Sequence, residues 1–460
     1  MKGIGNWLNQ QRHHLFDDLA KLVAVPSVST DRRHQREIAR SADIVANLMK
    51  RAGLDHVKLL SPGNANPFVF GESLQAPGAP TVLLYAHHDV QPAADEREWR
   101  SSPWKLTRRN GRLYGRGSAD DKGAIVAQLA AIAAYLKNNL PLPVNVKMLA
   151  EGEEEIGSEN LIPFVRRNRK LVDADIIVVC DTGNVATGFP SITYSLRGVI
   201  SLMVEVETAD GPRHSGFAGG VMPDAAIALN VILARLFWAN GKVRVPGFYD
   251  GMIPMTAQQR KWLKELPINE NKLREELGLL ARVQLANRVH PLEQTWRQPA
   301  VTVIAQEASS LANRSNQVLG KASAVISCRI VPGQNEQHVA QAVKKALTKD
   351  PPWNARVAVT PTRGLGAWMT DPEGPAFDAA RVALKTAFGK TPAMIGSGGS
   401  IGFVEPMAKL LDDAPVLMLG IEDAFSNAHA PNESLHEADW QKLALSLAYL
   451  LDEIGRRKKI

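Results

Sequence analysis

Only two cysteines, Cys180 and Cys328, occur in the 460 residues of this sequence. They have neither a zinc-finger nor a redox spacing, and both lie inside apolar runs, so we expect buried free thiols. No stretch approaches the roughly eighteen uninterrupted apolar residues that a membrane-spanning helix needs. Residues 1–10 contain a single lysine and no apolar core, which predicts no signal peptide. Together these absences predict a cytoplasmic protein without a membrane partner.

The sequence also lacks a concentration of charge. Its 54 lysine and arginine residues stand against 47 aspartate and glutamate residues, and the basic residues are dispersed. The basic run at 456–459 is the exception, and a solvated chain end explains it. We therefore expect no nucleic-acid partner. A hydrophobic content of 45% is typical of a globular protein, and the length predicts two domains, or three.

The first part of the sequence alternates between predicted strands and helices. Residues 12–25 and 35–52 have the apolar spacing of helices, and 124–136 is an apolar helical stretch. Three short runs rich in valine, isoleucine and leucine are typical of buried strands: 81–85, 144–150 and 175–180. This alternation predicts an α/β fold with a mostly parallel sheet flanked by helices.

From about Tyr194 the pattern changes to that of a smaller module. Two helices and three strands predict a ferredoxin-like α+β unit, interrupted by an irregular or helical insertion at 240–300. The predicted elements are strands at 199–206, 322–331 and 355–361, and helices at 223–236 and 337–347.

The α/β pattern returns after Trp368. It ends in a helix, for which Ser434 and Glu437 predict a capping box. We therefore predict that the smaller module is inserted into a domain made from both ends of the chain. The predicted boundaries are 1–194 and 367–460 for the larger domain and 195–366 for the inserted one.

Five side chains of the kinds that bind Zn²⁺ follow apolar runs in distant parts of the sequence. Ligands in an open α/β sheet bind beyond the carboxyl ends of the strands, so we expect these side chains to converge. Two imidazoles and three carboxylates predict a site for two divalent metal ions. The five residues are His87, Asp120, Glu155, Asp181 and His429.

Neighbouring residues predict further roles and leave alternatives open. Asp89 has the spacing to hold the second ring nitrogen of His87, as a ligating imidazole requires. His88 stays an alternative ligand, although strand alternation points it to the opposite face. Among the acids at 153–155, one would bind metal while a neighbour takes a proton from water. Judged alone, Asp120 is equally well explained as part of a helix N-cap, so the prediction rests on the whole ordered set.

At these residues the sequence resembles the dinuclear zinc peptidases of family M20, with the closest resemblance to the branch of cytosolic nonspecific dipeptidases and carnosinases. The resemblance covers nearly the whole chain. Its motifs, in order, lie at 85–92, 103–123, 151–158, 213–217, 327–332, 398–401 and 429–433.

The resemblance implies a division of the metal ligands. His87 and Asp181 would hold one ion, Glu155 and His429 the other, and Asp120 would bridge the two. Glu154 would be the general base, and Asp89 would orient His87. A cis peptide bond between Asp120 and Asp121 is also implied.

The resemblance further implies substrate-binding residues in and near the inserted domain. Arg329 would pair with the substrate carboxylate, beside Gly399 and Ser400. His214 would reach the site of the neighbouring subunit in a homodimer and stabilise the oxyanion there. The inserted domain would thus serve as a lid and for dimerisation.

The implied activity is hydrolysis of the amide bond of dipeptides by a water shared between two metal ions. Zinc is the implied metal, with manganese or cobalt as alternatives. The alternative enzyme is an N-acyl amino acid deacylase of the aminoacylase, succinyl-diaminopimelate or acetylornithine type. A silent binding protein would lack a ligand or the base, and this sequence retains all of them.

The sequence departs from the branch at three places. Ala86 replaces a usual glycine, and His88 beside His87 is unusual. Gly396 and Ser397 stand where the branch has an Arg-Glu-type pair. This last difference concerns the substrate pocket more than the metal ligands.

Overall fold

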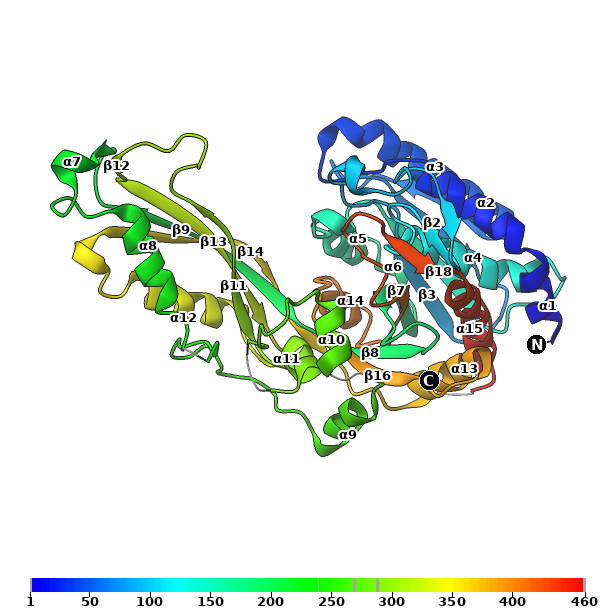
Figure 1. Cartoon of the computed structure of the whole chain (residues 1–460). Coiled ribbons are helices and arrows are strands. Elements are labelled where there is room, and N and C mark those ends of the chain that lie inside the picture. Colours follow the sequence, from blue (N-terminus) through cyan, green and yellow to red (C-terminus); the bar gives the residue numbers. More distant parts are fainter. Residues whose placement is uncertain (1, 239, 268–269, 287–288, 458–460) are drawn as a thin grey trace.

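The computed structural model describes residues 2–238, 240–267, 270–286 and 289–457. Figure 1 shows two bodies side by side. The larger one contains both chain termini, and the smaller one is built around a separate antiparallel sheet.

A nine-stranded mixed sheet forms the centre of the larger body. The neighbouring strands β6, β3, β7 and β17 run parallel, whereas most pairs toward the margins are antiparallel. The central strands are buried along nearly their whole length because helices cover both faces of the sheet. In spatial order the strands are β1 (Asp55–Leu60), β2 (Phe68–Ser73), β6 (Asn145–Glu151), β3 (Thr81–His87), β7 (Ile176–Gly183), β17 (Val416–Glu422), β8 (Ser191–Leu196) and β15 (Trp368–Met369), with β16 (Ala393–Ser397) paired to β8.

Helices from both ends of the chain cover the two faces. The apolar helix α4 is buried along almost its entire length, because it lies between the sheet and other helices. The helices that share this core are α1 (Lys2–Gln10), α2 (Arg12–Val23), α3 (Gln35–Ala52), α4 (Lys122–Leu136), α13 (Pro375–Phe388) and α15 (Glu437–Gly455). The other face carries α5 (Leu161–Arg167), α6 (Arg169–Val172) and α14 (Val404–Leu410).

The smaller body has the strand–helix–strand–strand–helix–strand order of a ferredoxin-like module. Along β13, buried and partly exposed residues alternate, so one face of the sheet packs on the helices. Its elements are β9 (Gly198–Glu207), α8 (Ala225–Ala234), β11 (Ala300–Glu307), β13 (Lys321–Ile330), α12 (Glu336–Thr348) and β14 (Arg356–Leu365). At the end farthest from the larger body lie β10 (Arg213–His214), α7 (Ser215–Ala218) and β12 (Gln317–Val318) (Figure 1).

The insertion predicted at 240–300 packs partly on the larger body. Leu263, Leu292 and Trp296 form a small apolar core with Val185 and Ile395 of that body. Its helices are α9 (Ala257–Glu265), α10 (Glu270–Glu276) and α11 (Pro291–Arg297). Sequence periodicity does not indicate this packing, since the apolar partners are distant in the chain.

The remaining short elements are a three-stranded sheet and single-turn helices. They are β4 (Thr107–Arg109), β5 (Arg112–Tyr114), β18 (Ser434–His436), η1 (Arg32–His34), η2 (Glu96–Glu98), η3 (Glu154–Ile156) and η4 (Pro352–Asn354).

The predicted α/β class with an inserted ferredoxin-like module is confirmed, although the large sheet is mixed. The predicted capping box is wrong, because Ser434 belongs to β18 and α15 begins at Glu437 after His436. No helix among the described residues is long and apolar enough to cross a membrane.

Gly198 lies at the point where the chain enters the smaller body. It packs against the segment by which the chain returns to the larger body. A Cβ on Gly198 would lie 2.4 Å from the Leu365 carbonyl oxygen and 2.7 Å from the Ala367 nitrogen. We expect Gly198→Ala to lower the free energy of unfolding by about 1–3 kcal/mol, because backbone must shift to admit the methyl group. Thermal and urea unfolding would measure this.

Gly366→Ala is the matched control, because a Cβ there has no neighbour within 4 Å. Equal stability of the two variants would show that the close contact between the entering and returning segments of the chain does not constrain the fold.

Candidate functional site

The carboxyl ends of three parallel strands bring distant side chains to one edge of the large sheet. His87 is the last residue of β3, and Asp181 lies near the end of β7. Glu154 and Glu155 lie in η3, directly after β6. Since β6, β3 and β7 are adjacent, this edge gathers an imidazole and several carboxylates in one place.

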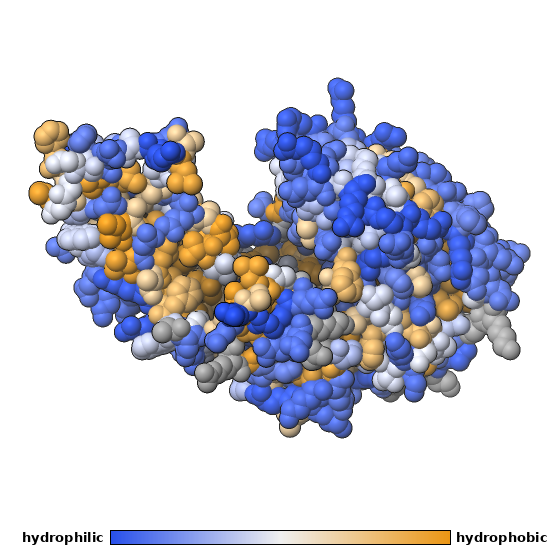
Figure 2. All heavy atoms as spheres, viewed as in Figure 1, coloured by the Kyte–Doolittle hydropathy of each residue, from blue (hydrophilic) through white to orange (hydrophobic). Residues whose placement is uncertain are grey.

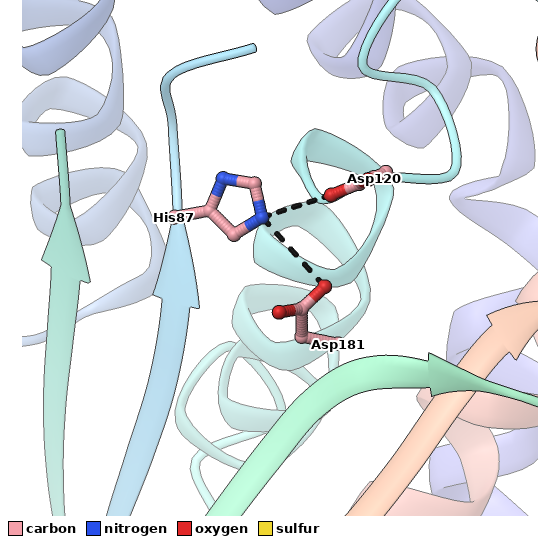
Figure 3. Close-up of side chains that lie close together, drawn as sticks. All are labelled: His87, Asp120 and Asp181. Atoms are coloured by element: carbon pink, nitrogen blue, oxygen red, sulfur yellow. Dashed lines mark hydrogen bonds and ion pairs between the residues drawn. The ribbon is translucent and has the colours of Figure 1, made fainter. Parts of the chain in front are cut away.

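His87, Asp120 and Asp181 form the first potential metal-binding group (Figure 3). The Nε2 atom of His87 is 2.9 Å from Oδ1 of Asp120 and 3.6 Å from Oδ1 of Asp181. His87 is fully buried. Burial alone would lower the pKa of His87, but hydrogen bonds with Asp120, Asp181 and Asp89 raise it well above its usual range.

Asp120, Glu155 and His429 form the second group. The Nε2 atom of His429 is 2.9 Å from Oδ2 of Asp120 and 3.2 Å from Oε2 of Glu155. Each carboxylate oxygen of Asp120 therefore faces a different histidine. The structure thus brings together all five side chains singled out from the sequence, with Asp120 common to both groups. The peptide bond between Asp120 and Asp121 is cis.

His88, the alternative to His87, lies outside both groups. Its Nε2 atom is 2.9 Å from the carbonyl oxygen of Pro67, and the side chain is fully buried. Burial lowers the pKa of His88 to about 4. A neutral, buried imidazole on the far side of the strand is a structural residue.

Asp89 connects the loop after β3 to the loop after β6. Its Oδ1 atom is 3.4 Å from Nδ1 of His87. Its two oxygens also accept hydrogen bonds from the backbone N–H groups of Glu154 and Glu155, at 3.2 and 3.1 Å. One buried carboxylate therefore orients the imidazole and positions both neighbouring acids.

Sequence reasoning missed Glu433, which organises the loop that carries Asp120. The fully buried Glu433 carboxylate accepts hydrogen bonds from the N–H groups of Gly117, Ala119 and Asp120 and pairs with Arg116 at 2.6 Å. Since Glu433 follows His429 by four residues, this network fixes two ligand-bearing loops relative to each other. The only sequence signal was the match at 429–433.

Gln91 was also missed. Its backbone N–H and side-chain amide donate to the two carboxylate oxygens of Glu155, at 3.1 and 2.9 Å. Its only sequence signal was the match at 85–92.

Burial and neighbouring negative charges raise the pKa of Glu154 and Glu155. Burial, followed by the charge of Asp181, raises the pKa of Glu154 well above its usual range. Burial and the nearby Asp120 raise the pKa of Glu155 to about 7. Such crowding of buried carboxylates is stabilised when cations lie between them.

A cleft of about 590 Å³ extends from these residues to the smaller body (Figure 2). Arg329 of β13 lines it and donates a hydrogen bond from Nη1 to Oγ of Ser400, at 2.9 Å. Gly399 lines the same cleft, and its N–H donates to Oγ of Ser397 at 3.0 Å. The structure thus places Arg329, Gly399 and Ser400 beside the candidate metal centre.

His214 lies far from this cleft in the same chain. It belongs to β10, next to α7 at the distal end of the smaller body (Figure 1). Its Nδ1 atom accepts a hydrogen bond from the Gly216 N–H at 3.0 Å, and the residue is exposed. Of the predicted site residues, His214 alone is not brought to the others.

Imidazoles and carboxylates gathered this closely, with a further acid beside them, suit metal-dependent hydrolysis, and this is the class to which the fold and the site point. Comparison with known proteins agrees: the chain belongs to peptidase family M20/M25/M40, whose pattern matches residues 83–453.

Individual relatives extend over the full chain. A cysteinylglycine-S-conjugate dipeptidase of Corynebacterium striatum is 32% identical over 98% of this chain and 97% of its own. The Beta-Ala-His dipeptidase of Rattus norvegicus is 29% identical over 97% of this chain and 94% of its own. The crystal structure of human carnosine dipeptidase 1 superimposes with a TM-score of 0.87 at 26% identity, covering 99% of both chains.

We expect Asp89→Asn to weaken metal binding by about 10- to 100-fold. An amide has one acceptor oxygen, so its NH₂ group would face a backbone N–H of Glu154 or Glu155. Competition with a chromogenic chelator would measure the affinity for zinc.

Asp95→Asn serves as the control, since Asp95 is paired with the exposed Arg97 away from the site. If both variants bound zinc as tightly as the original protein, Asp89 would have no role in positioning the ligands.

Proposed function

We propose that this protein is a dipeptidase that depends on two divalent metal ions. The observation that carries the proposal is the pair of three-residue groups that share Asp120. The names of the relatives support a dipeptide substrate. Deacylation of N-acyl amino acids is the second candidate, since it would use the same groups on a similar bond.

The residues present fit two divalent cations. Three carboxylates and two imidazoles are a donor set suited to zinc, our proposed metal, and also to manganese or cobalt. His87 and Asp181 would hold one ion, and Glu155 and His429 the other, with Asp120 between them. Ions bound there would polarise the scissile carbonyl group and favour the ionisation of water.

Glu154 is the proposed general base. It lines the cleft beside Glu155 and Asp181 but belongs to neither ligand group, so its carboxylate is free to accept a proton. It would take a proton from the attacking water and transfer it to the leaving amine. The hydrogen bond from its backbone N–H to Asp89 holds it in place.

Arg329 is the proposed partner of the substrate carboxylate. A guanidinium group offers two parallel N–H donors to a carboxylate, and Ser400 orients one of the Arg329 nitrogens. Gly399 and Ser400, which line the same cleft, would also contact the substrate.

We also propose that 195–366 form a lid that moves relative to a catalytic domain made of 1–194 and 367–460. The chain changes from the large sheet to the small one at Arg197, between β8 and β9, and returns at 366–367, between β14 and β15. These two short connections are the candidate hinge. The buried free thiols Cys180 and Cys328 support a cytoplasmic location.

The metal and substrate requirements can be tested together. Removal of metal by a chelator should abolish hydrolysis of L-alanyl-L-alanine, and zinc or manganese should restore it. Glu154→Gln should lower kcat by about 10²–10⁴-fold at unchanged metal content, because the amide cannot accept the proton. Product release and metal analysis would measure these outcomes.

N-acetyl and N-succinyl amino acids complete the substrate panel. Metal-dependent turnover of these compounds, with none of any dipeptide, would overturn the dipeptidase proposal in favour of a deacylase.

A homodimer would give His214 a role in catalysis. We propose that His214 reaches the cleft of the partner subunit and stabilises the developing oxyanion. Co-expression of the Glu154→Gln and His214→Ala chains should therefore recover about one quarter of the original activity, because half of randomly formed dimers contain one complete site. Activity no higher than that of either variant alone would argue against a shared site.

A further inference from the structure

Glu422 is an acidic residue of the cleft to which the proposed mechanism assigns no role. It is the last residue of β17 and lies opposite Gly183, two positions beyond Asp181 in the neighbouring strand β7. Its backbone carbonyl oxygen accepts a hydrogen bond from the Asn184 N–H at 2.7 Å, which fixes the backbone. Its side chain lines the cleft. Within the described ranges, no hydrogen bond or ion pair involves its carboxylate.

The surroundings of Glu422 place it at the metal end of the cleft. Burial raises the pKa of Glu422 well above its usual range, and the charges of Asp120 and Asp181 raise it further. Neither of the two metal-binding groups among the described residues includes Glu422. Its carboxyl group is therefore additional to the proposed ligands and to the proposed general base.

The wall of the cleft that β13 and β14 of the smaller body form carries positive charge. Arg329 and Arg363 line it, and Arg363 lowers the pKa of Arg329 after the effect of burial. Neither guanidinium group has a carboxylate partner among the residues that the structure describes. A Cβ on Gly157 would lie 3.6 Å from Nη2 of Arg363, so this side chain extends from β14 toward the loop that follows Glu155.

This distribution of charge matches the covalent geometry of an unblocked dipeptide. The ammonium nitrogen and the scissile carbonyl carbon are both bonded to the same Cα. With bond lengths near 1.5 Å, these two atoms lie about 2.5 Å apart. A receptor for it must therefore lie next to the groups that hold the carbonyl. The carboxylate is on the other side of the scissile bond, beyond the leaving nitrogen.

We propose that Glu422 binds the free α-ammonium group of the N-terminal residue of the substrate, so that the cleft selects dipeptides over N-acyl amino acids. This inference rests on the proposed dipeptidase function and refines its substrate class. A charge-assisted hydrogen bond to the carboxylate stabilises a substrate with a free amine. A substrate without that amine leaves the Glu422 carboxyl group without a partner in the cleft.

Glycyl-L-alanine and N-acetyl-L-alanine provide a matched test, since they differ only by the amine on the acyl carbon. For Glu422→Gln, the ratio of kcat/KM for glycyl-L-alanine to that for N-acetyl-L-alanine should fall about 10- to 100-fold, mainly through KM for the dipeptide. If N-acetyl-L-alanine reacts too slowly, its inhibition constant against glycyl-L-alanine replaces its kcat/KM.

Three controls accompany this comparison. Glu422→Asp retains the charge and should retain most of the preference for the free amine. Glu159→Gln, an exposed substitution outside the cleft, should leave the ratio unchanged. Metal content and the unfolding temperature of each variant show whether the site and the fold are intact.

An unchanged ratio in Glu422→Gln would overturn the inference. So would an equal loss on both substrates together with a loss of metal, which would instead make Glu422 a support of the metal site. Failure of the proposed function has a different signature, because the original protein with its metal would then not hydrolyse glycyl-L-alanine at all.

Discussion

The arrangement of charge around Asp120 is the constraint on which the rest of the site depends. Its two carboxylate oxygens face His87 and His429, which come from parts of the chain more than three hundred residues apart. Burying several carboxylates in one place is unfavourable unless cations and hydrogen-bond donors compensate. The fold positions the ligands through two further buried carboxylates, each of which accepts backbone hydrogen bonds. Asp89 contacts His87 and accepts hydrogen bonds from the backbone N–H groups of Glu154 and Glu155. Glu433 accepts hydrogen bonds from the loop that carries Asp120.

These supports explain why the ligands converge although they lie on loops. The parallel strands β6, β3 and β7 deliver three chain segments to one edge of the sheet, and this accounts for His87, Glu155 and Asp181. Asp120 follows β5, outside the large sheet, and His429 lies seven residues beyond the end of β17. Their loops are joined by the Arg116–Glu433 pair and by backbone hydrogen bonds to Glu433. The positions of these two ligands, which lie on loops, are thus fixed by a buried ion pair. Most polar atoms of that pair are hydrogen-bonded to backbone groups.

The sequence predicted the α/β class, the ferredoxin-like module and the five converging side chains, because these depend on local periodicity and on the strand-end rule. The residues that it did not predict depend on tertiary contacts. Glu433 and Gln91 are recognisable only once the loops that they join are adjacent. The capping box failed at Ser434 because this residue pairs with Tyr114 in the small sheet and α15 begins only at Glu437. The mixed character of the large sheet likewise depends on strand pairing that periodicity does not reveal.

The two walls of the cleft carry opposite charges and have different proposed roles. The catalytic body presents carboxylates, and the smaller body contributes the guanidinium groups of Arg329 and Arg363 through β13 and β14. A zwitterion bound between them would neutralise both ends and link the two bodies. A movement about the connections at Gly198 and Gly366 would change the distance between the charged ends. A short peptide recognised at both termini would therefore contact both bodies at once, whereas a ligand that engages one wall alone would not.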